Sequence, residues 1–135
     1  MSDAMKTQHG GSYYKNKAIQ PVEFGMANRY DPCIFSAMKY VSRHAEKNGE
    51  EDLRKGEHFV FLRLATNEEL PYARTKISPK YYCEANGMGE IETKIIIALH
   101  DWATGTYLGR EFSDADRATE LSNMFNALIA SAYPH

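Results

Sequence analysis

Apolar side chains recur every three or four residues along most of this chain, which is the spacing of α-helices that bury one face. The clearest stripe consists of Ile34, Met38, Val41 and Ala45, with Ala37 widening it. Asp31-Pro32 stands before this stripe as an N-cap followed by a first helical residue, and Asn48-Gly49 ends it. The pattern predicts an amphipathic helix between these two signals.

A second stripe begins after a short loop and consists of Leu53, Gly56, Val60 and Leu64, with Phe59 beside it. The acidic run 50–52 favours a helix start there, because negative charge is stabilising at a helix N-terminus. The short loop predicts that the two helices pack as an antiparallel hairpin. A glycine inside a helix costs up to about 1 kcal/mol relative to alanine, so Gly56 indicates the close approach of a neighbouring helix or a ligand.

Weaker signals precede the hairpin. Pro21 suits the first turn of a helix and predicts a short lead-in helix that extends to about Tyr30. Residues 1–12 lack the apolar core of a signal peptide and are expected to form a flexible tail.

Three further helices are expected after a polar linker at residues 67–77. They begin at Ser78-Pro79, at Glu90 and at Ser113, where proline, acidic or capping residues precede apolar periodicity. The isoleucine run 95–97 could form a strand, but the surrounding period of nearly four residues favours a helix.

The fold class predicted from these patterns is all-α, a helical-hairpin core with a lead-in helix and a C-terminal block of about three helices. The predicted divisions are a tail at 1–12, a hairpin domain at 13–66, a linker at 67–77 and a C-terminal helical block at 78–135 that packs on the hairpin domain.

Composition narrows the class of partner. Sixteen basic and eighteen acidic residues give a net charge of −2, which argues against the broad positive surface of a general nucleic-acid binder. No apolar run approaches the roughly 18 residues of a membrane span. Cys33 and Cys83 lie far apart within apolar patterns, which favours free, buried thiols in a reducing cytoplasm over a disulfide.

Several common catalytic and metal-binding motifs are missing from the sequence. It contains no P-loop pattern, no C-x-x-C or H-E-x-x-H pair and no G-x-S-x-G elbow. The acids at 50–52 are consecutive and fan around their helix, which disfavours a multi-carboxylate metal site. We therefore predict no protein-held metal, while Mg²⁺ carried in by a bound nucleotide stays compatible with the sequence.

The candidate chemistry lies in a basic set near the hairpin turn. Lys39 and Arg43 are four residues apart and share one side of their helix, and Lys55 follows across the turn. Arginine offers a fork suited to phosphate and lysine a point charge, so these cations could converge on a phosphate site, with Tyr40 beside them. Asp52 could orient a cation or accept a proton. Alternatively, Asp52 pairs with Arg43 in an ion pair that clamps the fold, and spacing alone leaves both interpretations open.

Other polar and aromatic residues carry weaker signals. His44 and His58 could approach each other across the hairpin, and His100-Asp101 resembles a base with an orienting acid, although single helical histidines are more often surface or satisfied residues. The aromatic candidates for stacking on a base, which could equally pack on the core, are Tyr13, Tyr14 and Tyr40.

The segments YYKNKAIQPVEF and FSAMKYVSRHAEKNGEEDLRKGEHFVFL resemble a family of small tailed-phage proteins of unknown function, a family that includes a phage nucleotide kinase without a Walker motif. The matching positions are Tyr14, Gln20, Pro21, Glu23, Ala37, Lys39, Tyr40, Arg43, Glu51, Asp52, Leu53 and Lys55. The family has a histidine where this chain has Tyr13, and an asparagine where it has Ser36. The match covers about a third of the chain and excludes the block from Ile77 onward.

This resemblance implies a phage-type protein in the cytoplasm of a bacterial host that binds a nucleotide in the hairpin groove and phosphorylates deoxynucleoside monophosphates. The nucleotide-binding residues implied are Tyr13, Tyr14, Gln20, Ser36, Lys39, Tyr40, Arg43 and Lys55. The residues implied to act in catalysis are Asp52 and Arg43.

Two alternatives come from other functional classes. The missing family histidine and asparagine suggest a non-catalytic sponge that sequesters a host immune-signalling nucleotide, whether mono-, tri- or cyclic. The second alternative is a regulator that docks a protein partner through the block around Trp102. In each case a homo-oligomer is expected, because small helical domains with an apolar last helix associate readily and can share pockets at subunit interfaces.

Overall fold

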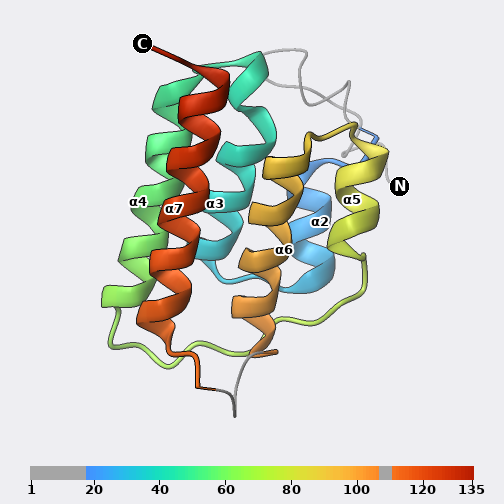
Figure 1. Cartoon of the computed structure of the whole chain (residues 1–135). Coiled ribbons are helices and arrows are strands. Elements are labelled where there is room, and N and C mark those ends of the chain that lie inside the picture. Colours follow the sequence, from blue (N-terminus) through green and yellow to red (C-terminus); the bar gives the residue numbers. More distant parts are fainter. Residues whose placement is uncertain (1–17, 107–110) are drawn as a thin grey trace.

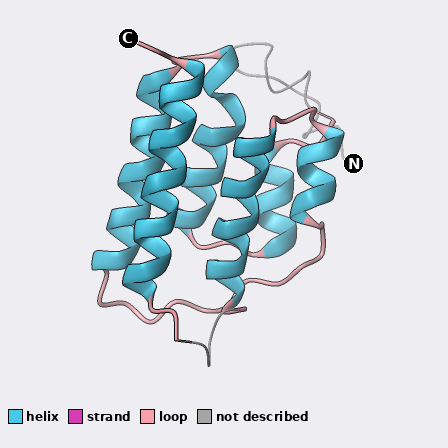
Figure 2. Ribbon diagram, in the orientation of Figure 1, coloured by secondary structure: helices cyan, strands magenta, loops and turns pink. Residues whose placement is uncertain are grey.

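The computed structural model describes residues 18–106 and 111–135, and within these ranges it contains helices and loops but no strand (Figures 1 and 2). The elements are α2 (Pro21–Asn28), α3 (Pro32–Arg43), the 3₁₀ turn η1 (His44–Glu46), α4 (Glu50–Ala65), α5 (Pro79–Ala85), α6 (Glu90–Thr104) and α7 (Asp114–Ala132). The all-α prediction is confirmed.

Helices α3 and α4 form the predicted hairpin, and α7 packs against α4 while α6 packs against both α7 and α3 (Figure 1). The short helices lie at the edge of this group, α2 against α3 and α5 against α6. The buried core draws on both halves of the chain, including Ile34 and Leu53 from the hairpin and Ile95 and Phe125 from the later helices. The proposed division at 67–77 stays a prediction. None of the described helices is both long enough and apolar enough to cross a membrane.

Capping side chains begin the helices where the sequence predicts them. Asp31 accepts hydrogen bonds from the backbone N–H groups of Cys33 and Ile34, both at 3.0 Å. Ser113 accepts from the N–H of Asp116 and donates its own N–H to the Asp116 carboxylate, which completes a capping box. These bonds satisfy N–H groups that a helix start otherwise leaves unpaired.

Two helix ends and the exposure of two apolar residues differ from the predicted pattern. Helix α3 ends at Arg43 and the chain continues as a 3₁₀ turn, which rotates Ala45 off the apolar face and leaves it exposed. Leu64 is 39% exposed because it lies in the last turn of α4, at the margin of the core. Helix α2 ends at Asn28, before the predicted Tyr30, because Arg29 takes a left-handed conformation with φ of 58°.

Gly56 allows α7 to approach α4 closely. A Cβ atom placed on Gly56 would lie 2.9 Å from Cε1 of the buried Phe125 ring. The neighbouring helix, rather than a ligand, therefore accounts for the glycine.

Both cysteines are free thiols, as predicted, but only Cys83 is buried, whereas Cys33 is half-buried. Burial raises the pKa of Cys83 to about 11, and burial also raises the pKa of Cys33. Both groups are therefore protonated near neutral pH and poorly reactive.

Candidate functional site

The structure brings the predicted cations together around one aromatic ring. Relative to the centre of the Tyr40 ring, Lys39 Nζ lies at 4.7 Å, Arg43 Cζ at 4.7 Å and Lys55 Nζ at 5.9 Å. The Phe59 ring stacks beside Tyr40 with a centroid separation of 6.1 Å and an interplanar angle of 20°. We call these five residues the Tyr40 cluster. Its geometry follows from the i, i+4 spacing on α3 and from the antiparallel packing of α4.

Within this cluster, Arg43 also forms the ion pair that the sequence left as an alternative. Its Nε and Nη2 atoms donate to the two carboxylate oxygens of Asp52 at 3.3 and 3.2 Å. Asp52 accepts a further bond from the N–H of Asn48 at 3.2 Å, and its side chain is fully buried, whereas Arg43 keeps 12% exposure. The carboxylate thus fixes the guanidinium and the hairpin turn, and it has no surface that a substrate could touch.

The two lysines are less constrained than Arg43. Lys55 pairs with Glu51 at 3.3 Å, but both side chains are exposed, so solvent and salt weaken this pair. Within the described ranges, Lys39 forms no ion pair. Lys39 is therefore the cation of the cluster that is most available to an incoming anion.

A small pocket adjoins the cluster through Lys39. It has a volume of about 100 Å³ and is lined by Gln20, Pro21, Val22, Phe35 and Lys39. We call it the Gln20 pocket. At about 30 Å³ per water it has room for a fragment of a ligand rather than for a whole nucleotide. Val22 and Phe35 line it without having been singled out from the sequence, since neither belongs to a charged or capping pattern.

The remaining predicted binding residues divide into two groups. Ser36 is half-buried and lies one helical turn before Tyr40, on the same side of α3. Tyr13 and Tyr14 fall outside the described residues.

His44 and His58 do not contact each other, and they match the favoured alternatives of a satisfied and a surface histidine. Both ring nitrogens of His44 are used, with Nδ1 at 2.7 Å from the Tyr133 hydroxyl and Nε2 at 2.9 Å from a Glu92 carboxylate oxygen. The bond to His44 lowers the pKa of Glu92. His58 is exposed and contacts the ring of Phe59 instead. Glu92 and Tyr133 are far from His44 in sequence, so no local pattern could have indicated them.

The His100-Asp101 pair does not have the geometry of a base and its orienting acid. His100 Nδ1 lies 2.6 Å from the Tyr30 hydroxyl, and Nε2 lies 2.7 Å from the Thr75 hydroxyl. Asn28 donates to the Tyr30 oxygen, so Tyr30 donates to Nδ1 and the Nε2–H donates to Thr75. Burial lowers the pKa of His100, which keeps the ring neutral within this network. The network holds the 67–77 connection against α2 and α6.

Two further observations concern metal binding and the block around Trp102. Among the described residues, no group of three or more His, Cys, Asp and Glu side chains could hold a metal ion. Trp102 is 3% exposed, so a docking surface in that block would have to use other side chains.

Comparison with known protein families gives a match in the first half of the chain. A family model described as a protein of unknown function (DUF3310) matches residues 5–60, a range that contains every predicted nucleotide-binding position and both members of the Arg43–Asp52 pair. Searches of the curated proteins and of the solved structures gave no match. In its first half, the chain is thus similar to a family whose description carries no activity.

Proposed function

We propose that this chain is a phage-type nucleotide-binding protein of the bacterial cytoplasm, and that it transfers a phosphoryl group to deoxynucleoside monophosphates. The observation that carries the proposal is the convergence of Lys39, Arg43 and Lys55 on Tyr40 beside the Gln20 pocket. The three cations suit the phosphate groups of a nucleotide. The adjoining pocket, which is lined by apolar side chains, the Gln20 amide and Lys39, suits part of its base.

Phosphoryl transfer depends on positioning and on charge neutralisation more than on covalent chemistry by the protein. In the proposal, Lys39 and Lys55 contact the phosphates as mobile point charges. Arg43 supplies a guanidinium whose orientation is fixed beforehand by Asp52, at 3.2 and 3.3 Å. Asp52 is then a positioning residue, because its full burial separates it from any substrate.

Recognition of the base is assigned to the surface between Tyr40 and the Gln20 pocket. Phe35 and Val22 offer apolar contact, and the Gln20 amide can both donate and accept hydrogen bonds at a base edge. Ser36 lies on the same side of α3 as Tyr40, within reach of a bound ligand's sugar or phosphate.

A magnesium ion, where one takes part, would enter with the nucleotide. Asp52, the carboxylate bonded within the cluster, is buried and already accepts three hydrogen bonds, so it fits poorly as a metal ligand. Phosphate oxygens and water suit Mg²⁺ without further protein ligands.

A coupled assay for diphosphate formation tests the proposal. Each deoxynucleoside monophosphate would be offered with ATP and Mg²⁺ to the wild-type chain, to Lys39→Gln and to Lys80→Gln. Lys80 is the matched control, an exposed helical lysine paired with Glu84 on α5. We expect product from wild type and Lys80→Gln and a loss of about tenfold or more in Lys39→Gln, the effect of removing one charged contact to phosphate. An absence of product with every monophosphate would refute the kinase.

A specific observation also favours the second candidate, a non-catalytic nucleotide sponge. Asp52, the carboxylate expected to accept a proton, is fully buried in an ion pair. Mass spectrometry of small molecules released from the purified, heat-denatured protein separates the two. An unmodified nucleotide recovered in stoichiometric amount, together with no turnover, supports the sponge.

The proposal extends to a homo-oligomer. Val22 and Met26 are 41% and 65% exposed on the outer side of α2, next to the Gln20 pocket. Light scattering after size-exclusion chromatography measures the mass, and a strict 15.4 kDa monomer at assay concentration would exclude this part.

A further inference from the structure

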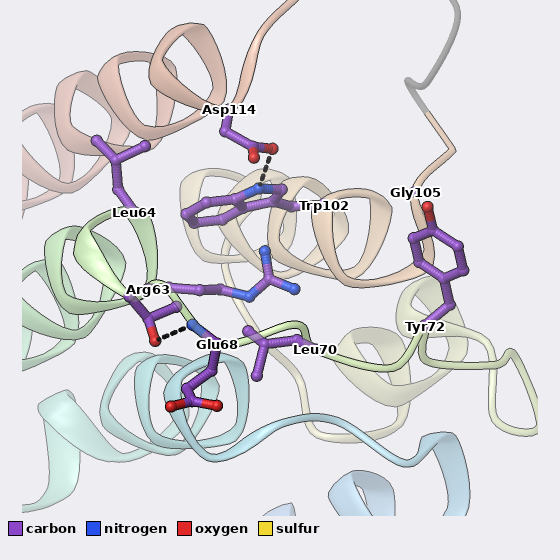
Figure 3. Close-up of a pocket in the computed structure, with 9 residues that line it drawn as sticks. Arg63, Leu64, Glu68, Leu70, Tyr72, Trp102, Gly105 and Asp114 are labelled. Atoms are coloured by element: carbon purple, nitrogen blue, oxygen red, sulfur yellow. Dashed lines mark hydrogen bonds between the residues drawn. The ribbon is translucent and has the colours of Figure 1, made fainter.

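A second pocket lies at the far end of the α3–α4 hairpin from the Arg43–Asp52 pair. It has a volume of about 210 Å³ and lies between the end of α4, the following segment and the facing ends of α6 and α7 (Figure 3). Its wall includes Arg63, Leu70, Tyr72 and Trp102. Arg63 follows Asp52 by eleven residues along α4, which corresponds to about 16 Å of helix. The pocket is therefore separate from the Tyr40 cluster and the Gln20 pocket.

Arg63 is held rigidly at this pocket. Its Nε donates to an Asp31 carboxylate oxygen at 2.9 Å, and its Cζ lies 4.5 Å from the centre of the Trp102 ring. The side chain is only 11% exposed. Ion pairing and stacking on an aromatic ring together fix the plane of the guanidinium.

The hydrogen bond to Asp31 uses Nε of Arg63 and leaves the N–H donors of the two terminal nitrogens unused. Neither one has a hydrogen-bond partner in the described part of the chain, and Figure 3 shows one of them directed toward Trp102 and the other toward the space bordered by Leu70 and Tyr72. A guanidinium fork that is nearly buried and still has unused donors is suited to a planar oxyanion.

The neighbouring acids do not bond to the terminal nitrogens of Arg63. Asp114 accepts from the indole N–H of Trp102 at 3.0 Å and lies across the indole from Arg63 (Figure 3). The Glu68 carboxylate points away from the guanidinium nitrogens in the same view. Asp31, the third acid, is occupied on the Nε side.

We propose that this pocket binds a small organic oxyanion, whose carboxylate or phosphate group is held by Arg63 and whose body lies against Leu70, Tyr72 and the edge of Trp102. At about 30 Å³ per water, 210 Å³ corresponds to about seven waters, so the ligand is a small molecule rather than a polymer. Tyr72 is 67% exposed and provides an aromatic face at the entrance. This site is independent of the proposed nucleotide function, because the two share no residue.

Trp102 is the chain's single tryptophan, so intrinsic fluorescence reports on this pocket directly. The full-length protein would be titrated with sodium benzoate and, separately, with inorganic phosphate at constant ionic strength. We expect a saturable change in emission with at least one of them. Saturation with benzoate identifies a carboxylate head with a flat body, whereas saturation with phosphate alone identifies a phosphate head. No saturable change with either anion would overturn the proposal.

Three variants test whether the anion binds at Arg63 in this pocket. Arg63→Gln should weaken anion binding about tenfold or more, the effect of losing a charge-assisted bidentate contact. Arg54→Gln, the matched control on the exposed side of α4, should bind within about twofold of wild type. Binding that is equal in Arg63→Gln and wild type would contradict the assignment.

Because Arg63 also bonds the α3 N-cap Asp31, its variant could unfold. Tyr72→Ala changes only an exposed side chain and gives a second test: benzoate should lose about threefold or more in affinity, while the affinity for phosphate is unchanged. If benzoate binds Tyr72→Ala as tightly as wild type, benzoate binds outside this pocket.

Discussion

Replacing Asp52 with asparagine tests whether the Arg43–Asp52 pair is a structural clamp. The change keeps the size of the side chain but removes its charge, so the Arg43 guanidinium, which is only 12% exposed, loses its ionic contact with Asp52. Breaking a buried ion pair on one side costs about 3–5 kcal/mol. We take the lower limit, about 3 kcal/mol, because asparagine keeps one acceptor and the edge of Arg43 reaches solvent.

This loss converts into a change in melting temperature. With about 2.1 cal/mol/K per residue, unfolding of the 135-residue chain has an entropy near 0.28 kcal/mol/K, so about 3 kcal/mol lowers Tm by about 10 °C. Thermal and urea unfolding would be followed by the fluorescence of Trp102 and by far-UV circular dichroism.

Glu51→Gln is the matched control, because Glu51 is the adjacent acid, is 65% exposed and pairs with the exposed Lys55. Its free energy of unfolding should stay within about 0.5 kcal/mol of wild type. The reasoning is refuted if Asp52→Asn melts like wild type, or if both variants lose the same stability.

Three further outcomes follow from the packing and protonation of the core. Gly56→Ala should lower the free energy of unfolding by about 1–2 kcal/mol, because the added Cβ would lie 2.9 Å from the Phe125 ring, and this clash outweighs the higher helix propensity of alanine. A variant that is more stable than wild type in urea titration would contradict this. Since burial lowers the pKa of His100 below its unfolded value, the unfolded chain binds the proton first, so this contribution to stability is present above about pH 6.5 and is lost as the pH falls. His100→Gln can still accept the hydrogen bond from Tyr30 but does not titrate, so it should flatten the slope of stability between about pH 5 and 7. The buried Cys83 thiol, with its pKa raised to about 11, should react with iodoacetamide only after unfolding, and fast alkylation of the native protein at pH 7.5, detected by mass spectrometry, would disagree.

The helices could be predicted because their signals are local. Asp31-Pro32 and Ser113 placed helix starts correctly, since an N-cap bonds to N–H groups two or three residues away. Ala45 and Leu64 were assigned to buried stripes on period alone, and both are exposed. A periodic pattern does not reveal where an α-helix tightens into a 3₁₀ turn or where the core ends.

The candidate site was predictable in part, for the same physical reason. The convergence of Lys39 and Arg43 follows from their spacing on one helix, and that of Lys55 from the short hairpin loop. The partners of His44 lie 48 and 89 residues away along the chain, and such contacts depend on how α6 and α7 pack. The pocket lined by Arg63 and Trp102 could not be predicted from the sequence either, because its walls come from three helices and a loop that meet only in the folded chain.

Calorimetric titration of nucleotides into wild type, Lys39→Gln and Lys80→Gln measures binding at the Tyr40 cluster without requiring turnover. The ligands would be deoxynucleoside mono- and triphosphates and a cyclic nucleotide, each at two salt concentrations, since contacts to phosphate weaken with ionic strength. We expect wild type and Lys80→Gln to bind at least one of them with the same affinity, and Lys39→Gln to bind it about tenfold or more weakly. Wild-type protein that binds none of these nucleotides, or Lys39→Gln that binds as tightly as wild type, would contradict a nucleotide site at Tyr40.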